Sequence, residues 1–355
     1  MRLGLKNKLM LDLYRPVVAE DARTHVLRQL FWECTLKCNM QCRHCGSDCK
    51  VSSTVPDMPF ADFRKVLERV AGAYDPHKIM VVITGGEPLM RKDLEKCGLD
   101  IYRLGFSWGL VSNGRLMSPK RFDALLAAGL HSATISLDGF QEEHDWMRGV
   151  KGSFAYASQA VKMLANEPSI VFDVVTCVNK RNFHTLREFR DYLISVGLRR
   201  WRLFTVFPVG RAADDPELQL DNGEFRQLLD FIAETRKEGM IKANYACEGF
   251  LGPYEGRVRD NLYSCNAGIS VASVLADGSI SACASIRSDY HQGNIYKDDF
   301  VDVWKNRFQP YRDRSWMRKD KCGDCRFFKY CLGGGMHLRT DDGKLLFCHM
   351  DRLGR

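Results

Sequence analysis

The chain has 355 residues, 45% of them hydrophobic and 27% charged, so it is long enough to bury a large core and form two or three domains. Its formal net charge of +8 is spread along the chain and forms no basic block interleaved with aromatic residues, which argues against a nucleic-acid-binding protein. Charge and proline interrupt the apolar residues near the N-terminus, and no apolar run is long enough to span a bilayer. We therefore expect a cytoplasmic protein without a membrane span.

Short apolar segments alternate with amphipathic stretches between residues 27 and 207. The apolar segments predict strands at 27–32, 79–84, 106–111, 131–137, 170–178 and 201–207. The amphipathic stretches predict helices at 59–74, 92–104, 119–128, 153–165 and 183–196. This alternation indicates right-handed βα units and a parallel sheet, either in a partial barrel or in a doubly wound fold.

The pattern changes after residue 207. Residues 211–260 resemble a linker with one helix at 224–238, and residues 1–26 form an N-terminal extension. Beyond residue 260, strand signals at 271–275 and 279–283 flank Asp277-Gly278, a hairpin turn dipeptide. Because this part is rich in turns and cysteines, we expect residues 261–355 to form a small domain that metal holds together, after an α/β domain at 27–210.

Polar turns follow the second, third and fourth predicted strands. They are Gly85-Gly86-Glu87-Pro88, Ser112-Asn113-Gly114 and Ser136-Leu137-Asp138-Gly139. A first group of cysteines follows the first strand in the same way. Active sites of β/α barrels lie at the carboxyl ends of the strands, so these four features predict a single site at that face.

The 14 cysteines point to metal, because disulfides are rare in the cytoplasm and most of these cysteines fall in two groups. Cys38, Cys42 and Cys45 have the spacing Cys-x3-Cys-x2-Cys. Three thiolates on one loop can hold three irons of a [4Fe–4S] cluster and leave the fourth iron open to a small molecule. Zinc is the alternative, with His44 or Cys49 as a fourth ligand.

This loop resembles the motif of the radical S-adenosylmethionine (SAM) superfamily, Cys-x3-Cys-x-aromatic-Cys, with His44 in the aromatic place near the adenine of SAM. The resemblance implies that Gly85, Gly86, Glu87 and Pro88 receive the methionine amine of SAM and that Ser112 and Asn113 lie near its ribose. Ser136 and Arg148 resemble the serine and arginine that hold SAM in the SPASM subgroup. The chain as a whole also resembles a branch of this subgroup that is associated with lipoproteins. The implied fold is a partial (β/α)6 TIM-like barrel followed by a small iron–sulfur SPASM domain.

The second group of cysteines resembles the SPASM pattern. Cys265 and Cys283 frame Gly278, and Cys322, Cys325, Cys331 and Cys348 follow. The resemblance implies that the last four hold one auxiliary [4Fe–4S] cluster and that the first two hold another, with Cys247 as a third ligand. The family continues its motif with Cys-x3-Cys, but residue 335 is glycine, so this second auxiliary cluster is either open at one iron or lost. A structural zinc ion on the last four cysteines is the alternative.

By resemblance, the protein cleaves SAM reductively to a 5′-deoxyadenosyl radical, which abstracts a hydrogen atom from a peptide or protein. Epimerisation and crosslinking are the expected modifications, and a flavodoxin or ferredoxin supplies the electron. Sulfatase maturation is disfavoured because Ala284 stands where those relatives carry an acidic residue. The alternatives are a small-molecule substrate, such as a tetrapyrrole or a sugar, and a non-catalytic iron–sulfur electron carrier.

Overall fold

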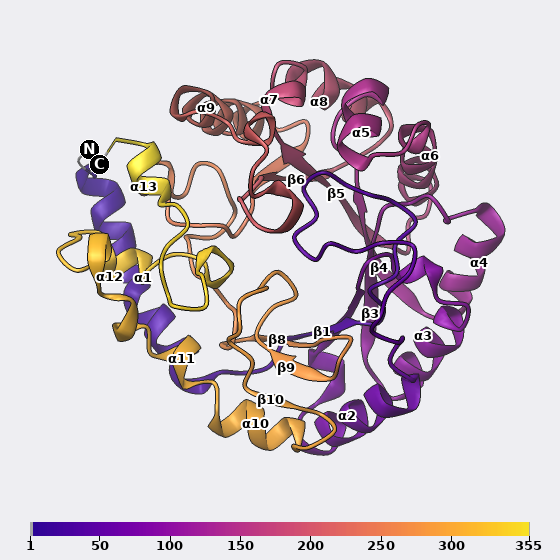
Figure 1. Cartoon of the computed structure of the whole chain (residues 1–355). Helices are drawn as coiled ribbons and strands as arrows, with labels where there is room; N and C mark the ends of the chain where they lie inside the picture. Colours follow the sequence, from indigo (N-terminus) through magenta and orange to yellow (C-terminus); the bar gives the residue numbers. More distant parts are fainter. Residues whose placement is uncertain (1–2, 355) are drawn as a thin grey trace.

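A single ten-stranded sheet curves through the computed structural model, which describes residues 3–354 (Figure 1). Its strand order is β10-β9-β8-β1-β2-β3-β4-β5-β6-β7, and neighbours from β8 through β7 pair in parallel. The barrel strands are β1 (Gln29–Glu33), β2 (Met80–Thr84), β3 (Ser107–Ser112), β4 (Leu130–Ser136), β5 (Val171–Val178), β6 (Arg200–Thr205) and β7 (Lys242–Tyr245). The strands β8 (Val271–Val274), β9 (Ser279–Ser281) and β10 (Gly293–Asn294) complete the sheet.

Helices cover the outer face of this sheet, as expected for βα units (Figure 1). They are α2 (Phe60–Ala73), α3 (Leu94–Arg103), α4 (Pro119–Ala127), α5 (Gln141–Arg148), α6 (Ser153–Ala165), α7 (Lys180–Phe183), α8 (Leu186–Ser195) and α9 (Asn222–Glu238). Large aromatic side chains form much of the core between the two layers. Trp32 of β1 stacks on Phe63 of α2 with ring centroids 4.6 Å apart, and Trp201 of β6 meets Phe189 of α8 edge to face. Such pairs add about 0.5–1.5 kcal/mol beyond the burial of their surface.

The six expected strands are present, with ends shifted by one or two residues. The expected helix at 183–196 is present as α8, and a separate short helix, α7, precedes it because Asn179 and Asn182 form a capping box. The linker also holds more than its expected helix. Its strand β7 extends the sheet beyond β6, with Arg200 opposite Lys242.

The C-terminal part of the chain joins the same sheet. The strand β8 pairs in parallel with β1, with Gln29 opposite Val271, so the sheet runs from the barrel into the region expected to form the small domain. The helices α10 (Phe300–Asn306), α11 (Gln309–Arg312), α12 (Phe328–Cys331) and α13 (His349–Arg352) and the loops between them occupy the side of the ring between β10 and α9 (Figure 1).

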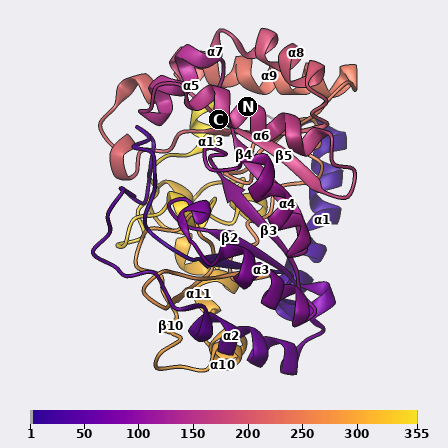
Figure 2. The same ribbon diagram turned by 90° about the vertical axis from the view of Figure 1, so that its right-hand side faces the viewer.

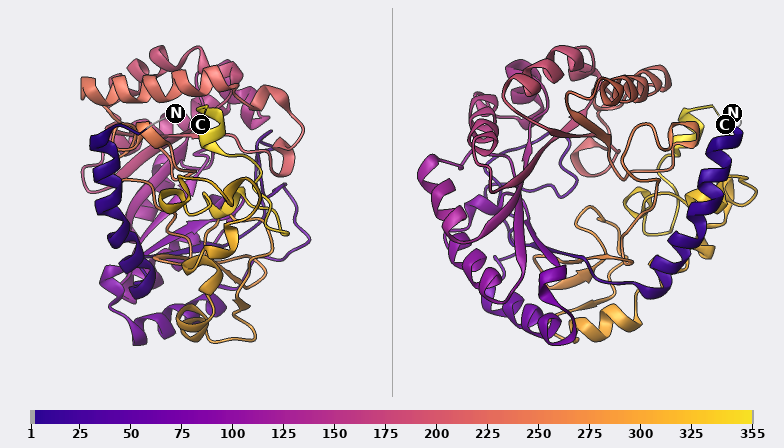
Figure 3. Two further views of the ribbon diagram at one scale, coloured as in Figure 1. Left: turned by 90° about the vertical axis from the view of Figure 1, so that its left-hand side faces the viewer. Right: turned by 180° about the vertical axis from the view of Figure 1, so that it is seen from behind.

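The N-terminal extension forms a long helix, α1 (Leu5–Thr24), which runs along the outside of the C-terminal part (Figure 3). The Tyr330 hydroxyl and the Lys329 ammonium both donate to the Asp12 carboxylate of α1, at 2.9 and 3.2 Å. The first turn of α1 lies close to α13 (Figure 3). Within residues 3–354, no helix has the length and apolar character needed to cross a bilayer.

Candidate functional site

The residues expected to bind SAM surround one cavity of about 150 Å³ at the carboxyl ends of the barrel strands. The loop after β1 lies over this end of the barrel (Figure 2). Pro88 is the one expected SAM residue that does not line the cavity. It is buried and begins a short 3-10 helix at Pro88–Met90, where its missing N–H costs nothing, so it shapes the turn that carries Glu87. The lining includes Cys38, Cys42, His44, Cys45, Gly85, Gly86, Glu87, Ser112, Asn113, Ser136 and Arg148.

The glycine turn packs directly against the cysteine loop. The Gly86 N–H donates to the Thr35 carbonyl at 2.8 Å, and the Glu87 N–H donates to the Lys37 carbonyl at 2.9 Å. A Cβ atom on Gly85 would lie 2.3 Å from the Thr35 oxygen, and one on Gly86 would lie 2.3 Å from the Lys37 oxygen. Both positions therefore need glycine, since any side chain would push the two motifs apart.

Glu87 is 1% exposed, yet three hydrogen bonds satisfy its carboxylate. The Leu89 N–H and the Ser112 hydroxyl donate to Oε1 at 3.0 and 2.8 Å, and the Asn113 N–H donates to Oε2 at 2.8 Å. Burial raises the pKa of Glu87 above its ordinary value, although these donors oppose the shift. A buried carboxylate of this kind gains from a cationic ligand in the cavity, because the ligand would offset the cost of desolvation.

Arg148 is held by a buried acidic residue. Its Nε donates to Oδ2 of Asp138 at 2.7 Å, and its Nη1 lies 3.7 Å from the Cys42 sulfur. Burial alone would raise the pKa of Asp138, but the charge of Arg148, the two nearby histidines and the Cys177 N–H together lower it. The guanidinium thus lies between a carboxylate and the cysteine loop. Arg148 ends α5, a helix that the sequence did not indicate because its residues are almost all polar.

Burial favours the neutral form of both His44 and His144. Burial lowers the pKa of His44 to about 3 and that of His144 to about 4. The Asp138 N–H donates to Nδ1 of His144 at 3.0 Å, so the proton of this ring lies on Nε2. His44 lines the cavity, and its buried Nδ1 has no hydrogen-bond partner among the described residues. Such an orphaned polar atom beside an expected ligand site fits a bound group.

Arg211 is a site residue that no sequence motif indicated. It follows β6, lines the cavity, and donates from Nε to the Cys42 carbonyl at 2.8 Å and from Nη1 to the Cys49 carbonyl at 3.2 Å. The Arg211 N–H also donates to the Cys45 carbonyl at 3.2 Å. These contacts fasten the cysteine loop to the opposite side of the barrel. Only the position of Arg211 just after a strand, a common place for site residues, could have indicated it.

Two further cysteines lie beside this loop. Cys49 is buried and donates from its thiol to the Cys45 sulfur, which lowers the pKa of Cys45 to about 5. Cys34 is fully buried, and its N–H donates to the Thr84 carbonyl, so it packs between β1 and β2. Cys97 and Cys177 lie on α3 and β5, outside both groups.

The last four cysteines line one apolar cavity, together with Phe250, Phe327 and Phe347. Burial raises the pKa of Cys331 to about 12, and the neighbouring thiols of Cys348, Cys322 and Cys325 contribute to the shift. A guanidinium also reaches this group, since Nη2 of Arg339 lies 3.7 Å from the Cys322 sulfur. Four thiols around one apolar cavity with a buried cation fit an anionic iron–sulfur cluster.

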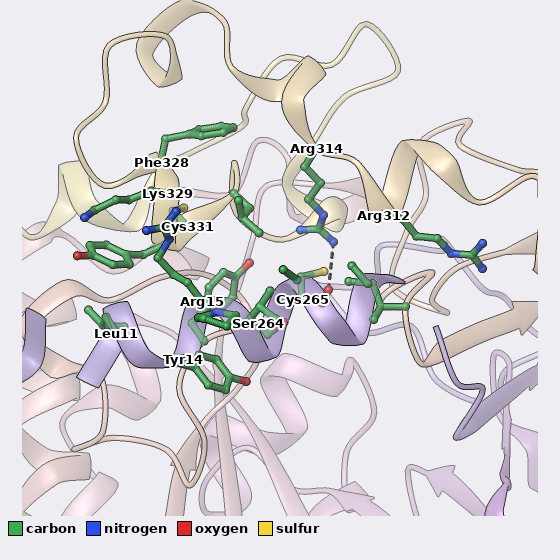
Figure 4. A pocket seen from close by; sticks show the side chains of 18 of the residues that line it. Leu11, Tyr14, Arg15, Ser264, Cys265, Arg312, Arg314, Phe328, Lys329 and Cys331 are labelled. Carbon is green, nitrogen blue, oxygen red and sulfur yellow. Dashed lines mark hydrogen bonds between the residues drawn. The ribbon is translucent and has the colours of Figure 1, made fainter. Parts of the chain in front are cut away.

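The remaining three cysteines also come together. Cys247 follows β7 and stays exposed, yet surrounding chain raises the pKa of its thiol to about 12, to which the thiols of Cys283 and Cys265 contribute. Arg314 is 5% exposed and donates to the Cys265 carbonyl at 3.1 Å (Figure 4). Cys265 and Cys331 both border a cavity of about 590 Å³ beside α1 (Figure 4). One cysteine of each set therefore faces the same cavity.

Among residues 3–354, no three Cys, His, Asp or Glu side chains converge closely enough to hold a single metal ion. The three thiols of the SAM loop instead surround an open cavity with an orphaned histidine nitrogen, and the last four surround a second cavity. Both places suit a cluster larger than one ion. The residues present thus fit the implied cofactors at these two sites.

Two family profiles match the chain. The radical SAM superfamily profile matches residues 32–193, and the profile of SPASM, an iron–sulfur cluster-binding domain, matches residues 265–326. The cofactors of these domains are a SAM-binding [4Fe–4S] cluster and auxiliary iron–sulfur clusters. The second profile favours iron–sulfur over zinc for the C-terminal cysteines within its range.

Curated relatives match over most of their length. The AdoMet-dependent heme synthase of Methanosarcina barkeri is 27% identical over 338 residues, which cover 88% of this chain and 92% of the relative. The Fe-coproporphyrin III synthase of the same organism is 26% identical over 85% of this chain and 81% of its own. The mycofactocin maturase MftC of Mycolicibacterium smegmatis is 29% identical over 88% of this chain and 79% of its own.

Solved structures share the fold. The chain named anSMEcpe, solved with bound AdoMet, superposes with a TM-score of 0.72 at 18% identity and covers 92% of this chain and 94% of its own. SuiB of Streptococcus suis, also solved with S-adenosylmethionine, gives a TM-score of 0.69 at 17% identity over 89% of this chain and 75% of its own. A partial barrel followed by a cluster-binding region is thus the architecture of this chain.

Proposed function

Because this chain belongs to the radical SAM superfamily and carries a SPASM domain, we propose that it is a radical SAM enzyme that oxidises a side chain of a tetrapyrrole. The observation that carries this proposal is the set of relatives named as heme and Fe-coproporphyrin III synthases, which align along almost the whole chain. A tetrapyrrole therefore replaces the peptide as the first candidate substrate.

A second cavity inside the barrel supports a substrate of this size and charge. Its volume is about 570 Å³, within the range of small-molecule sites. Phe31, Val82 and Phe172 give it apolar walls, while Arg200, Arg202 and Lys242 give it cations. Val111 borders both this cavity and the SAM cavity, so the two adjoin. A tetrapyrrole has an apolar ring and carboxylate side chains, so it could contact both the apolar residues and the cations of this cavity.

Arg200 is the cation best suited to a substrate carboxylate. Arg202 pairs with Asp173, and the Lys242 ammonium lies 3.0 Å from Asp260. No acidic residue among residues 3–354 pairs with Arg200. We infer that Arg200 binds a propionate of the substrate, since guanidinium groups recognise carboxylates well.

The roles of the chain's own residues follow from their positions. Cys38, Cys42 and Cys45 would hold the SAM-binding cluster, and Glu87, Ser112, Asn113, Ser136 and Arg148 would orient SAM. Arg211 and the two glycines fix the cysteine loop against the barrel. When bound, the cofactors supply a 5′-deoxyadenosyl radical that removes a hydrogen atom from a substrate side chain. For a propionate that loses CO₂, they also accept the one electron that the substrate radical gives up. A flavodoxin or ferredoxin is the proposed source of the reducing electron.

The test is SAM cleavage by the anaerobically reconstituted enzyme under dithionite, with Fe-coproporphyrin III as the substrate. We expect 5′-deoxyadenosine to form faster with the porphyrin than without it. The product should be lighter by CO₂ and two hydrogens for each changed propionate. One of these hydrogens is the atom abstracted from carbon, and the other leaves to solvent as the carboxyl proton. A porphyrin lacking propionates is the matched control. Cleavage that no tetrapyrrole accelerates would contradict the proposal.

A peptide substrate is the second candidate, because the mycofactocin maturase also aligns over 88% of this chain. The same assay separates the two substrates when synthetic peptides replace the porphyrin. Acceleration by a peptide alone, with a mass change in that peptide, would favour this second candidate.

A further inference from the structure

The three-cysteine set has a gap at a defined position. Cys247, Cys265 and Cys283 supply three thiols, and Gly335 stands where the SPASM pattern continues with a cysteine. A [4Fe–4S] cluster on these thiols alone would keep one iron without a protein ligand. The atoms nearest to a side chain at residue 335 belong to His337 and Glu248.

The His337 ring fills that place. A Cβ atom on Gly335 would lie 2.6 Å from Cε1 of His337 and 3.0 Å from its Nδ1. A side chain at residue 335 and this imidazole would therefore compete for the same space. The glycine thus makes room for the His337 ring.

The segment 335–337 contacts Cys265 and lies against the residue that follows Cys247. The Met336 N–H donates to the Cys265 sulfur. The missing Cβ of Gly335 would lie 2.7 Å from the carbonyl oxygen of Glu248, the residue after Cys247. The thiols of Cys247, Cys265 and Cys283 are themselves close enough to influence one another. The residues directly before His337 thus lie beside the three-cysteine set.

Nε2 of His337 is buried and has no hydrogen-bond partner among the described residues. An unsatisfied buried nitrogen costs about 1–3 kcal/mol, so its presence needs a reason. Phe207, just after β6, packs against the ring with centroids 4.9 Å apart and limits its rotation. A neutral imidazole nitrogen is a good ligand for iron, and histidine replaces cysteine in some iron–sulfur centres.

We propose that Nε2 of His337 is the fourth protein ligand of an auxiliary [4Fe–4S] cluster held with Cys247, Cys265 and Cys283. Exchange of an anionic thiolate for a neutral imidazole makes the cluster less negative, and this raises its reduction potential relative to an all-cysteine cluster. The assignment concerns the cluster alone and stands whichever substrate the enzyme uses.

The test uses full-length protein reconstituted anaerobically in the Cys38→Ala/Cys42→Ala/Cys45→Ala background, which removes the signal of the SAM cluster. Pulsed electron paramagnetic resonance of the reduced protein reports nitrogen bound to iron. We expect a strong ¹⁴N coupling that changes when the histidines carry ¹⁵N. It should vanish in His337→Ala and persist in His184→Ala, a variant of an exposed histidine.

Iron analysis and potentiometry complete the test. In this background we expect about eight irons per chain. His337→Ala leaves three thiols, which can still hold a cluster with one open iron, so the nitrogen coupling rather than the iron content identifies the ligand. Because the alanine variant can misfold, His337→Cys is the second variant. It should retain about eight irons, lose the nitrogen coupling and show a more negative potential for one cluster. A background protein without histidine coupling, or one with only about four irons, would overturn the assignment.

Discussion

The buried pair of Asp138 and Arg148 gives a quantitative test of how the SAM cavity is built. Asp138 is fully buried, and its Oδ2 accepts from Arg148 while its Oδ1 accepts the Cys177 N–H at 2.9 Å. The substitution Asp138→Asn keeps the shape and one acceptor but removes the charge. Arg148 is then left as a buried cation without its counter-charge.

Loss of one partner from a buried ion pair costs about 3–5 kcal/mol of unfolding free energy. Because the amide oxygen of the introduced asparagine can still accept one hydrogen bond, we expect Asp138→Asn to cost about 3 kcal/mol. For a large domain, about 2 °C of melting temperature accompanies each kcal/mol, so a fall of roughly 6 °C is expected. The double variant Asp138→Asn/Arg148→Met removes both charges. It should be more stable than the sum of the single effects predicts, by about 2 kcal/mol.

The measurement is thermal unfolding by circular dichroism at one scan rate, on the wild type, both single variants and the double variant with matched iron content. Strictly additive losses would refute the view that the two charges stabilise each other. So would a single variant as stable as the wild type. SAM binding should stay weak in the double variant even where stability recovers, because Arg148 also lines the SAM cavity.

Three other predictions test the site and the substrate cavity. Gly86→Ala should weaken SAM binding at least tenfold by equilibrium dialysis, since its Cβ would meet the Lys37 carbonyl at 2.3 Å, whereas Gly46→Ala on the cysteine loop has nothing within 4 Å and should bind normally. The variant Cys38→Ala/Cys42→Ala/Cys45→Ala should form no 5′-deoxyadenosine and lose about four irons per chain, and any residual cleavage would argue against these ligands. Arg200→Gln should raise KM for the porphyrin about tenfold and leave SAM cleavage without substrate unchanged, and an unaltered KM would exclude a role in substrate binding.

The barrel and its SAM motifs were predictable because their signals are local. Each strand is a short apolar run, and each motif follows directly on its strand, as Gly85 follows β2. The helix α1 was not predicted because Pro16 lies inside it and most of its residues are exposed. Neither its composition nor its periodicity therefore distinguishes it from an irregular N-terminal segment.

Other features depend on contacts that no local pattern encodes. The strand β7 has four residues, and its pairing with β6 is what identifies it. The union of β8 with β1 joins residues about 240 positions apart, beyond the reach of any spacing argument. Asp138 stood within a noted turn, but its role required Arg148 to fold back onto it. His337 was similarly visible only as a histidine near cysteines, and its place emerged from the space beside Gly335.

The pairing of β8 with β1 has a consequence for the order in which the newly made protein matures. The first barrel strand leaves the ribosome early, but one of its edges stays unpaired until residue 274 has been synthesised. Until then, the N-terminal three quarters of the chain would have an unpaired edge of β1 next to the cysteine loop. Iron delivered during translation would meet an unfinished barrel, so insertion of the clusters is expected to follow release of the whole chain.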